Sequence, residues 1–384
     1  MIRVAVIGIG SISDAHIQAY RTFRNRCEIA ALCDIYVDKA EKGRQRYQLG
    51  CAVYQDYQEL LQRDDIDLVS VCTPPYTHAE IAVNALKCGK HVIVEKPMAS
   101  SLEECDRMNE AAAAAGKILS VISQNRFGDT IAKLKRVLDS GLAGNIVHAQ
   151  VDSFWWRGYV YYDLWWRGTW EKEGGGCTLN HAVHHIDMLQ WLMGMPEQVT
   201  AVMNNTSHDN AEVEDLSIAI LSYPRALAQI TSSVVHHGEE QQLIFQGEKA
   251  RVSLPWRVTA STSKENGFPQ QNHELIEAIN DLASQVPALS YTGHQGQLDD
   301  VLAAIENGTG DVVVTGQEGR KTLELITAIY QAASTGASVR LPLPPDSPFY
   351  TRDGIMANAP RFYEKKTSVA GFSKNEITIS GETK

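Results

Sequence analysis

The chain has 384 residues, which is enough for two domains with a substantial core. Its 35 basic and 46 acidic side chains give a formal charge of −11, and they form no basic footprint of the kind that a nucleic-acid partner requires. Seven scattered cysteines show no repeated C-x-x-C spacing, so we expect reduced thiols in a cytoplasmic protein, with no leader and no apolar stretch of about 18 residues to span a membrane.

The first predicted elements are a strand over residues 1–7, a glycine turn and a helix over residues 14–23. Gly8 permits the tight turn, and Gly10 lets backbone amides approach a pyrophosphate at the positive end of the helix. Ser13 stands where such turns usually have a third glycine. This order predicts a dinucleotide site. The turn residues that we assign to the cofactor are Gly8, Gly10, Ser11 and Ile12.

A second apolar run, over residues 29–33, ends at Asp34. The Asp34 carboxylate can accept hydrogen bonds from a ribose 2′-hydroxyl and would repel a 2′-phosphate, so we expect NAD as the cofactor. Lys39, Lys42 and Arg44 follow closely in the sequence and keep NADP as the weaker alternative.

Further strands over residues 66–72, 91–94 and 118–122 alternate with helical stretches. This alternation predicts an α/β domain that ends at residue 123, with a doubly wound parallel sheet and its ligand at the carboxyl ends of the strands. A cation just past a buried strand is costly without a task, so Lys96 is a catalytic candidate; the alternative is a strand-end lysine paired with Glu95. The strand-end residues that we assign to the cofactor are Thr73, Pro74, His78, Glu95 and Lys96, and for His78 a structural role is the competing interpretation.

The next part of the chain, residues 124–345, predicts an α+β domain with an open, mainly antiparallel sheet, because turns rather than crossover helices join its strands. Residues 346–384 are polar and predict an extended arm or a disordered tail. The expected strands are 146–154, 198–204, 216–221, 226–235, 242–246, 250–254 and 339–342, and the expected helices are 131–138, 294–306 and 318–333.

A glycine run at residues 174–176 precedes a segment rich in histidine. The glycines allow the backbone to pass close to a flat ring, and a helix is expected to follow, on which Asn180 and His184 are four apart and face the same way. Asp187 can hold one nitrogen of His184, which is the arrangement of an oriented acid–base histidine. The alternative is a metal site, with ligands drawn from Cys177, His181, His184 and His185.

Residues 155–170, which we call the aromatic arm, carry five of the seven tryptophans. Flat apolar faces suit the C–H faces of a sugar ring, and guanidinium groups suit hydroxyls or a carboxylate. A subunit contact is the equally weighted alternative, because interfaces prefer the same residue types. The residues that we assign to the substrate are Arg126, Trp155, Arg157, Tyr162, Arg167, Asn180 and His184.

Taken together, these motifs resemble the Gfo/Idh/MocA family, named for glucose-fructose oxidoreductase, inositol dehydrogenase and rhizopine catabolism. The resemblance covers roughly residues 1–345 and rests on Gly8-x-Gly10, Thr73-Pro74-x-x-x-His78, Glu95-Lys96-Pro97, the glycine run and His184-x-x-Asp187. It implies a Rossmann domain and an NAD(P)-dependent oxidoreductase of a sugar, sugar acid or cyclic polyol, with Lys96 and His184 as the catalytic pair. Inositol dehydrogenases have an aspartate at the position of Asn180, so we expect Asn180 to position a substrate hydroxyl.

Two other functions stay open at this point. One is an NAD-dependent glycoside hydrolase that uses transient oxidation, and the other is a non-catalytic NAD-binding regulator. Because the exposed face of an open sheet needs covering, we also expect a homodimer or homotetramer.

Overall fold

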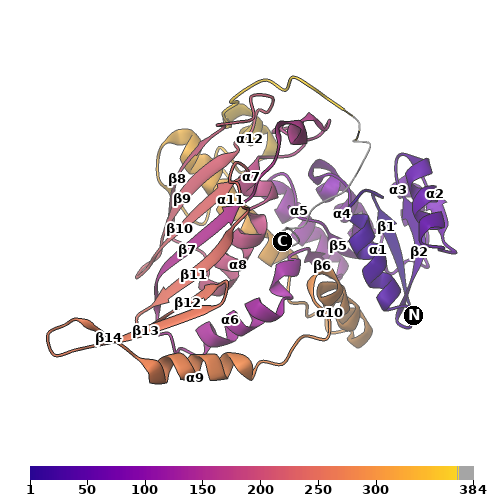
Figure 1. The fold of residues 1–384 in the computed structure, drawn as a ribbon. Helices are drawn as coiled ribbons and strands as arrows, with labels where there is room; N and C mark the ends of the chain where they lie inside the picture. Colours follow the sequence, from indigo (N-terminus) through magenta and orange to yellow (C-terminus); the bar gives the residue numbers. More distant parts are fainter. Residues whose placement is uncertain (370, 372–384) are drawn as a thin grey trace.

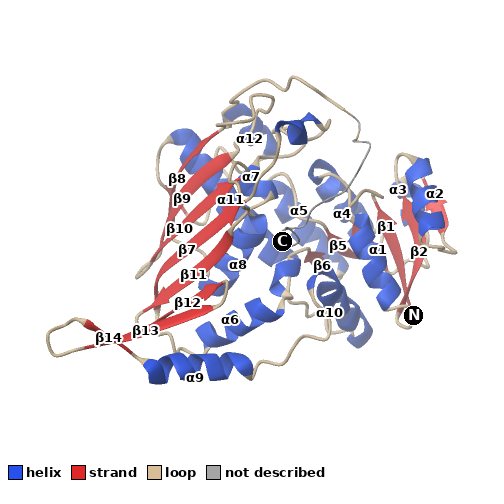
Figure 2. Ribbon diagram, in the orientation of Figure 1, coloured by secondary structure: helices blue, strands red, loops and turns tan. Residues whose placement is uncertain are grey.

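The structure is a computed structural model that describes residues 1–369 and 371. Two sheets stand on opposite sides of the molecule, with helices between them, as Figures 1 and 2 show. Among the described residues, no helix combines the length and the apolar character needed to cross a bilayer.

The N-terminal sheet is parallel throughout and has the order β3-β2-β1-β4-β5-β6. The predicted doubly wound α/β sheet is therefore confirmed. The order reverses between β1 and β4, so the carboxyl ends of these two strands flank the switch point where such sheets bind ligands. The strands are β1 (Ile2–Ile7), β2 (Cys27–Cys33), β3 (Ala52–Tyr54), β4 (Leu68–Val71), β5 (His91–Val94) and β6 (Leu119–Val121). The helices are α1 (Ser13–Thr22), α2 (Val37–Arg46), α3 (Tyr57–Leu61), α4 (His78–Lys87) and α5 (Leu102–Ala115), with a short 3-10 turn η1 (Pro75–Thr77).

The second sheet has nine strands in the order β14-β13-β12-β11-β7-β10-β9-β8-β15. Only β7 and β10 pair in parallel among its described strands, so the predicted mainly antiparallel sheet is confirmed. The β13–β14 hairpin was not predicted. The strands are β7 (Ile146–Phe154), β8 (Gln198–Asn204), β9 (Leu216–Ser222), β10 (Leu227–Ser233), β11 (Gln241–Gly247), β12 (Ala250–Leu254), β13 (Arg257–Ser263), β14 (Pro269–Gln271) and β15 (Val339–Arg340).

Helices cover one face of this sheet, and α11 lies between it and the N-terminal domain (Figure 1). The other face is exposed and carries apolar side chains: Val202, Ile218, Ile220 and Leu227 are 45–65% exposed. The remaining helices are η2 (Gln124–Arg126), α6 (Asp129–Asp139), η3 (Tyr159–Asp163), α7 (Cys177–Asn180), α8 (Val183–Met193), α9 (His273–Ser284), α10 (Gly293–Asn307), α11 (Gly316–Thr335) and α12 (Arg352–Asn358).

Helix α10 crosses the predicted domain boundary. Its residues Leu298, Val301 and Leu302 are buried in the same hydrophobic cluster as β1 and α1 of the N-terminal domain. Arg26, which precedes β2, also pairs with two acidic side chains of α10. The segment 124–345 therefore contributes a helix to the first domain's core, and the first residues of that helix lie near the ends of β4 and β5.

Residues 346–369 form an arm that packs on the second domain. Phe349 is fully buried and α12 follows it, so the alternative of a disordered tail does not hold for this stretch. The rest of the predicted tail, residue 370 and residues 372–384, lies outside the described residues.

Candidate active site

The glycine turn joins β1 to α1 at the switch point of the N-terminal sheet. Gly8 has φ +92°, and a Cβ there would lie 2.7 Å from the carbonyl carbon of Cys72, so only glycine fits. Gly10 is different, because a Cβ there would meet nothing within 4 Å and its outer side is open. Ser11 and Ile12 are exposed, and no side chain caps α1. The first amides of this ten-residue helix therefore face a space that suits a pyrophosphate.

Asp34 lies directly after β2 and is fixed by two backbone amides. Its carboxylate oxygens accept hydrogen bonds from Ile9 and Tyr36, each at 2.8 Å. The side chain is partly exposed beside the glycine turn, at the place where dinucleotide-binding sheets hold a ribose.

The loop after β4 is held together by its own polar groups. The hydroxyl of Thr77 donates to Thr73 and to the carbonyl of Pro74. His78 is fully buried, with Nε2 2.7 Å from the carbonyl of Thr73 and Nδ1 2.9 Å from that of Pro97. The assignment of His78 to the cofactor is therefore wrong for its side chain, because both ring nitrogens are occupied in joining two loops.

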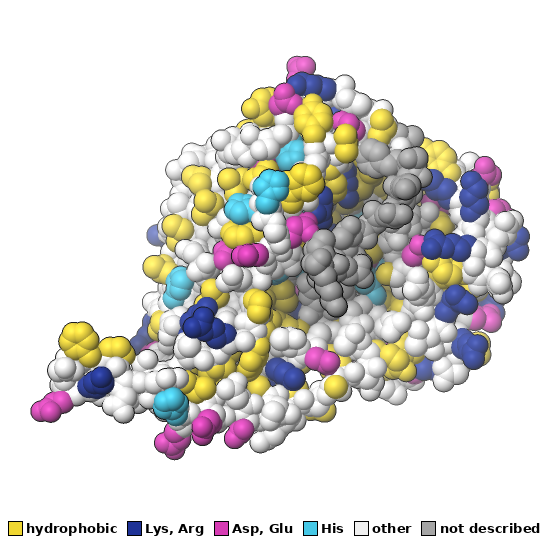
Figure 3. Space-filling view, in the orientation of Figure 1, with side chains coloured by type: hydrophobic (Ala, Val, Ile, Leu, Met, Phe, Trp, Pro, Cys, Tyr) yellow, Lys and Arg dark blue, Asp and Glu magenta, His cyan; other side chains and the backbone are white. Residues whose placement is uncertain are grey.

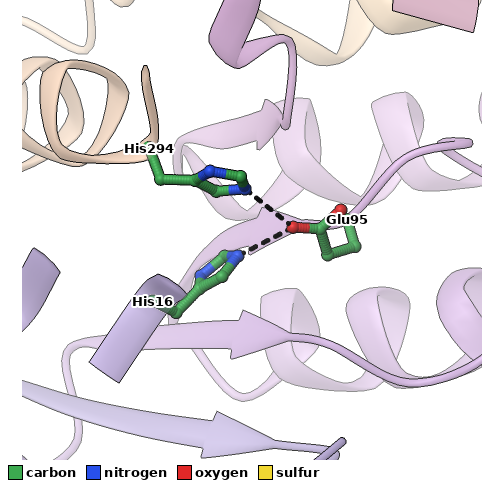
Figure 4. A group of neighbouring side chains, drawn as sticks. All are labelled: His16, Glu95 and His294. Carbon is green, nitrogen blue, oxygen red and sulfur yellow. Dashed lines mark hydrogen bonds and ion pairs between the residues drawn. The ribbon is translucent and has the colours of Figure 1, made fainter. Parts of the chain in front are cut away.

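Glu95, at the end of β5, also differs from the prediction. Its carboxylate is buried and accepts hydrogen bonds from His16 of α1 at 3.0 Å and from His294 of α10 at 3.3 Å (Figure 4). Burial alone raises the pKa of Glu95, but the two imidazoles outweigh it and hold the pKa well below 4.5. Glu95 is thus a buried anion that ties α1 and α10 to the end of β5.

Lys96 follows Glu95 and points toward the second domain. Its ammonium donates a hydrogen bond of 3.1 Å to the backbone carbonyl of Asn180, which leaves two further N–H donors. Burial lowers the pKa of Lys96, and the charge of Glu95 opposes this effect. Lys96 is therefore a positioned cation rather than a strand-end lysine paired with Glu95.

The glycine run before α7 packs against the protein interior and not against a ligand ring. A Cβ on Gly175 would lie 2.2 Å from the Tyr330 hydroxyl, and one on Gly176 would lie 1.9 Å from the Glu214 carbonyl. The Glu214 carboxylate accepts hydrogen bonds from the amides of Gly176 and Thr178, both at 3.0 Å. Burial raises the pKa of Glu214 to about 7. The Glu214 carboxylate therefore caps the N-terminus of α7, which no side chain of the glycine run does.

The predicted single helix is two short ones. α7 ends at Asn180 and α8 begins at Val183, so Asn180 and His184 do not share a helix face. The side chain of Asn180 donates to the carbonyls of Gly175 and Gly176, at 3.1 and 3.4 Å. Asn180 therefore shapes the glycine turn with its side chain and holds Lys96 with its backbone.

His184 lies in the first turn of α8 and is partly exposed. Burial is the largest effect on this imidazole and the positive charge of Lys96 the next, and together they hold the pKa of His184 well below 6.5. A neutral imidazole beside a lysine cation can accept a proton from a hydroxyl group that the lysine also contacts.

The predicted hydrogen bond between Asp187 and His184 is wrong. Both oxygens of Asp187 accept from Arg126, each at 2.8 Å, and Thr322 donates to one of them. Arg126 also pairs with Glu318 at 3.0 Å, and its side chain is completely buried. The assignment of Arg126 to the substrate is therefore wrong as well, because its guanidinium is fully used inside the second domain.

Most of the aromatic arm lies at the surface. Trp156, Tyr159 and Val160 are exposed, and hydrophobic and histidine side chains gather on the upper part of the face shown in Figure 3. Tyr162 is only 1% exposed and packs edge-on against His208, so its assignment to the substrate is wrong and it belongs to the core.

The inner side of the arm borders the histidine segment. Trp155 lies against His181, with ring centroids 5.8 Å apart. Arg157 pairs with Glu239 at 2.6 Å and lies over the ring of Trp155. Arg167 lies 4.2 Å from the ring centre of Tyr161. Both arginines therefore keep one face on an aromatic ring while their guanidinium groups pair with carboxylates, Arg157 with Glu239 and Arg167 with Glu173.

The sequence analysis gave His181 no place at the substrate site and named it only as an alternative metal ligand. The structure places His181 beside the arm: its Nε2 is 3.4 Å from the Tyr161 hydroxyl, and its Nδ1 is buried with no hydrogen-bond partner among the described residues. Burial lowers the pKa of His181 well below 6.5, and Arg157, Arg167 and Lys96 act in the same direction. The signal available in the sequence was its place between two catalytic candidates, Asn180 and His184.

The predicted alternative of a metal site in the histidine segment finds no support. Within the described part of the chain, only His16, Glu95 and His294 bring three potential ligand atoms within 4.8 Å of one another. His185 instead bonds through Nδ1 to the Ser153 hydroxyl at 2.9 Å, and burial lowers its pKa to about 4.

Comparison with known proteins agrees with this geometry. Residues 2–123 match the family model described as "Oxidoreductase family, NAD-binding Rossmann fold", and residues 131–253 match the GFO/IDH/MocA C-terminal domain. A solved structure of the WlbA dehydrogenase from Chromobacterium violaceum is 31% identical, with a TM-score of 0.77 over 89% of this chain and 96% of its own. The chain belongs to the GFO/IDH/MocA family.

Two further GFO/IDH/MocA relatives are similar over most of their length. The D-glucoside 3-dehydrogenase of Escherichia coli K12 is 26% identical over 88% of this chain and 97% of its own. The inositol 2-dehydrogenase/D-chiro-inositol 3-dehydrogenase of Shouchella clausii is 27% identical over 91% of this chain and 96% of its own. The open side of Gly10, the uncapped start of α1 and the ordered carboxylate of Asp34 fit the NAD that this family binds.

Proposed function

We propose that this protein is an NAD-dependent dehydrogenase or reductase of a sugar, sugar acid or cyclic polyol, with Lys96 and His184 as its catalytic pair. The observation that carries the proposal is the hydrogen bond of 3.1 Å by which Lys96 of the first domain reaches the Asn180 carbonyl of the second domain, four residues before His184. The positive charge of Lys96 also contributes to the lowered pKa of His184.

Each member of the pair has one task. Bound NAD supplies the hydride acceptor. His184 takes the proton of the substrate hydroxyl, which a neutral imidazole with a lowered pKa can do at neutral pH. Lys96, held by the Asn180 carbonyl, directs its remaining N–H groups at the same oxygen and stabilises its developing negative charge.

The substrate class follows from the wall of the site and from the relatives. Trp155 offers an apolar face, while Arg157 and Arg167 offer donors for hydroxyls or a carboxylate. The named relatives act on glucosides and inositols, and the WlbA structures hold NADH with a UDP-linked sugar acid. We therefore place a carbohydrate ring against the arm, and the Asn180 side chain remains a candidate for positioning one of its hydroxyls.

The test is a turnover assay of the purified protein with NAD⁺ and a panel of methyl glucoside, myo-inositol, glucuronate and UDP-N-acetylglucosaminuronate. We expect reduced nicotinamide with at least one of them, and its loss in Lys96→Met and His184→Asn while NAD still binds. Lys87→Met and His273→Asn remove exposed side chains of the same types and should leave turnover unchanged. Retained turnover in both site variants contradicts the proposal. Glycoside cleavage without an absorbance change, or NAD binding without any turnover, would favour the hydrolase or the regulator instead.

We also propose that a second copy of the chain covers the exposed face of the large sheet. Ile220 and Val202 are 52% and 65% exposed on adjacent strands, which is costly for a face that stays in water. Light scattering should give a multiple of the 42.4 kDa chain mass, and Ile220→Lys should shift it toward the monomer. A monomeric wild-type protein contradicts this proposal.

A further inference from the structure

Lys365 makes an unusual set of contacts with the aromatic arm. Its ammonium donates hydrogen bonds to three backbone carbonyls, those of Tyr162, Leu164 and Arg167, at 2.5, 3.1 and 2.9 Å. An ammonium group has three N–H donors, so all of them are satisfied by one short stretch of the arm. Because the three carbonyls converge on one ammonium group, Lys365 ties the backbone of residues 162–167 together at one point.

The residues on either side of Lys365 reinforce this contact, and we call residues 360–369 the C-terminal strap. At one end, the Trp170 indole donates to the carbonyl of Pro360 at 2.8 Å. At the other end, the backbone amide of Trp165 donates to the carbonyl of Val369 at 2.9 Å, and the backbone amide of Val369 donates to the carbonyl of Asp163 at 2.8 Å. The strap therefore pairs with the aromatic arm like a short strand. The strap therefore holds the arm at both ends and in the middle.

The held part of the arm leads directly to the catalytic lysine. The guanidinium of Arg167 pairs with Glu173 at 2.8 Å, and the second oxygen of Glu173 accepts from the amide of Gly168. Glu173 immediately precedes the glycine run, and α7, which follows that run, ends at Asn180, the residue whose carbonyl holds Lys96. The charge of Arg167 also contributes to the lowered pKa of Lys96, so the two cations lie near each other.

The strap lies outside the parts of the chain that define the family. The two family models match residues 2–123 and 131–253, so neither includes Lys365.

We propose that Lys365 is a positioning residue for the substrate site: it fixes the backbone of the aromatic arm and so holds Arg167 in its contacts with Tyr161 and Glu173. The C-terminal strap is then part of the substrate site, although it lies far from the catalytic residues in sequence. The expected effect of Lys365 on KM rests on the proposed dehydrogenase function, whereas its effect on the backbone of the aromatic arm does not.

Two variants of the full-length protein separate the two consequences. Lys365→Met keeps the length of the side chain and removes the three donors. Lys366→Met makes the same change at the next residue, whose ammonium pairs with Asp209 between two exposed side chains. Hydrogen–deuterium exchange of residues 159–168, measured with NAD bound, should be about tenfold faster in Lys365→Met than in wild type, and unchanged in Lys366→Met.

The kinetic measurement uses the same pair of variants with methyl glucoside and with glucuronate. We expect KM for the sugar to rise about tenfold in Lys365→Met, with the affinity for NAD unchanged, because only the arm is loosened. If exchange is faster in Lys365→Met but the wild-type protein shows no turnover, the dehydrogenase function is overturned and the role of the strap stands. Equal exchange in the two variants overturns the strap itself. If Lys365→Met does not fold, Val369→Pro, which removes the amide donated to Asp163, should give the same faster exchange, and wild-type exchange in that variant also overturns the proposal.

Discussion

The buried carboxylate of Glu95 gives the sharpest test of the structure, and Glu95→Gln is the perturbation. Glutamine has the same shape and keeps one acceptor oxygen, but it carries no charge. In the native protein one carboxylate oxygen accepts from His16 at 3.0 Å and His294 at 3.3 Å, and the other accepts from the backbone amide of Lys96 at 3.2 Å. The substitution therefore changes three hydrogen bonds in a site that is only 4% exposed.

The expected loss of stability follows from these contacts. A hydrogen bond to a charged group stabilises by about 1.5–3 kcal/mol and a neutral one by about 0.5–1.5 kcal/mol, so neutralising the acceptor of two imidazoles costs roughly 2 kcal/mol. If the amide oxygen stays with the imidazoles, the new NH₂ group faces the N–H of Lys96, and two donors then meet. We expect a total loss of about 2–4 kcal/mol in the free energy of unfolding.

Differential scanning calorimetry at pH 7.5 measures this loss as a fall in Tm of about 5–10 °C. Glu110→Gln, an exposed substitution in α5, is the control and should leave Tm unchanged. The folded-state pKa of Glu95 lies below 4.5, so its contribution is complete above that pH and is lost only as the pH falls through the lower value. The fall in Tm caused by Glu95→Gln should therefore be the same at pH 5.5 as at pH 7.5. A Tm within about 1 °C of wild type would refute the view that Glu95 is a paired, buried anion.

Three further predictions concern the cofactor, the buried ion pair and the base. Asp34→Ala weakens the preference for NAD; titration of both cofactors measures it, and an unchanged affinity ratio contradicts it. Asp187→Asn lowers the free energy of unfolding by about 3 kcal/mol because the buried Arg126 loses one of its two charged partners and keeps only Glu318. The substitution leaves the pH profile of kcat in place, and a shifted profile would mean that Asp187 orients His184. Because the pKa of His184 lies well below 6.5, its basic form persists as the pH falls through 6.5, and a loss of kcat/KM centred there would argue against it as the base.

The sequence predicted the elements whose pattern is local. Strands β7, β8 and β12 have the predicted bounds, because buried and exposed positions alternate along β7 and β8 and turn residues flank all three. The β13–β14 hairpin was missed because most of its residues are exposed: only Val258 and Ala260 of β13 turn inward, and β14 is exposed throughout. Helix α10 was found, but nothing in its own sequence shows that it packs on the first domain.

The site shows the same limit more clearly. Lys96 could be found because a cation after an apolar strand is unusual in itself. The partner of Asp187 could not be found from the sequence, because Arg126 lies 61 residues earlier. The second carboxylate that pairs with Arg126, that of Glu318, comes from α11. A carboxylate three residues from a histidine on a helix is within reach of it, but a buried guanidinium that needs two acceptors is the stronger competitor.

The loss of that carboxylate changes how His184 works. With Asp187 committed to Arg126, no anion stabilises the imidazolium form of His184 through a direct hydrogen bond among the described residues. Burial, the charge of Lys96 and the positive end of α8 all disfavour that form. An environment of this kind makes His184 a weaker base when the alcohol is oxidised and a stronger acid when the ketone is reduced. Within the proposed function, the backbone carbonyl of Asn180 therefore acts on His184 indirectly, because it holds the Lys96 charge that helps to lower the pKa of His184.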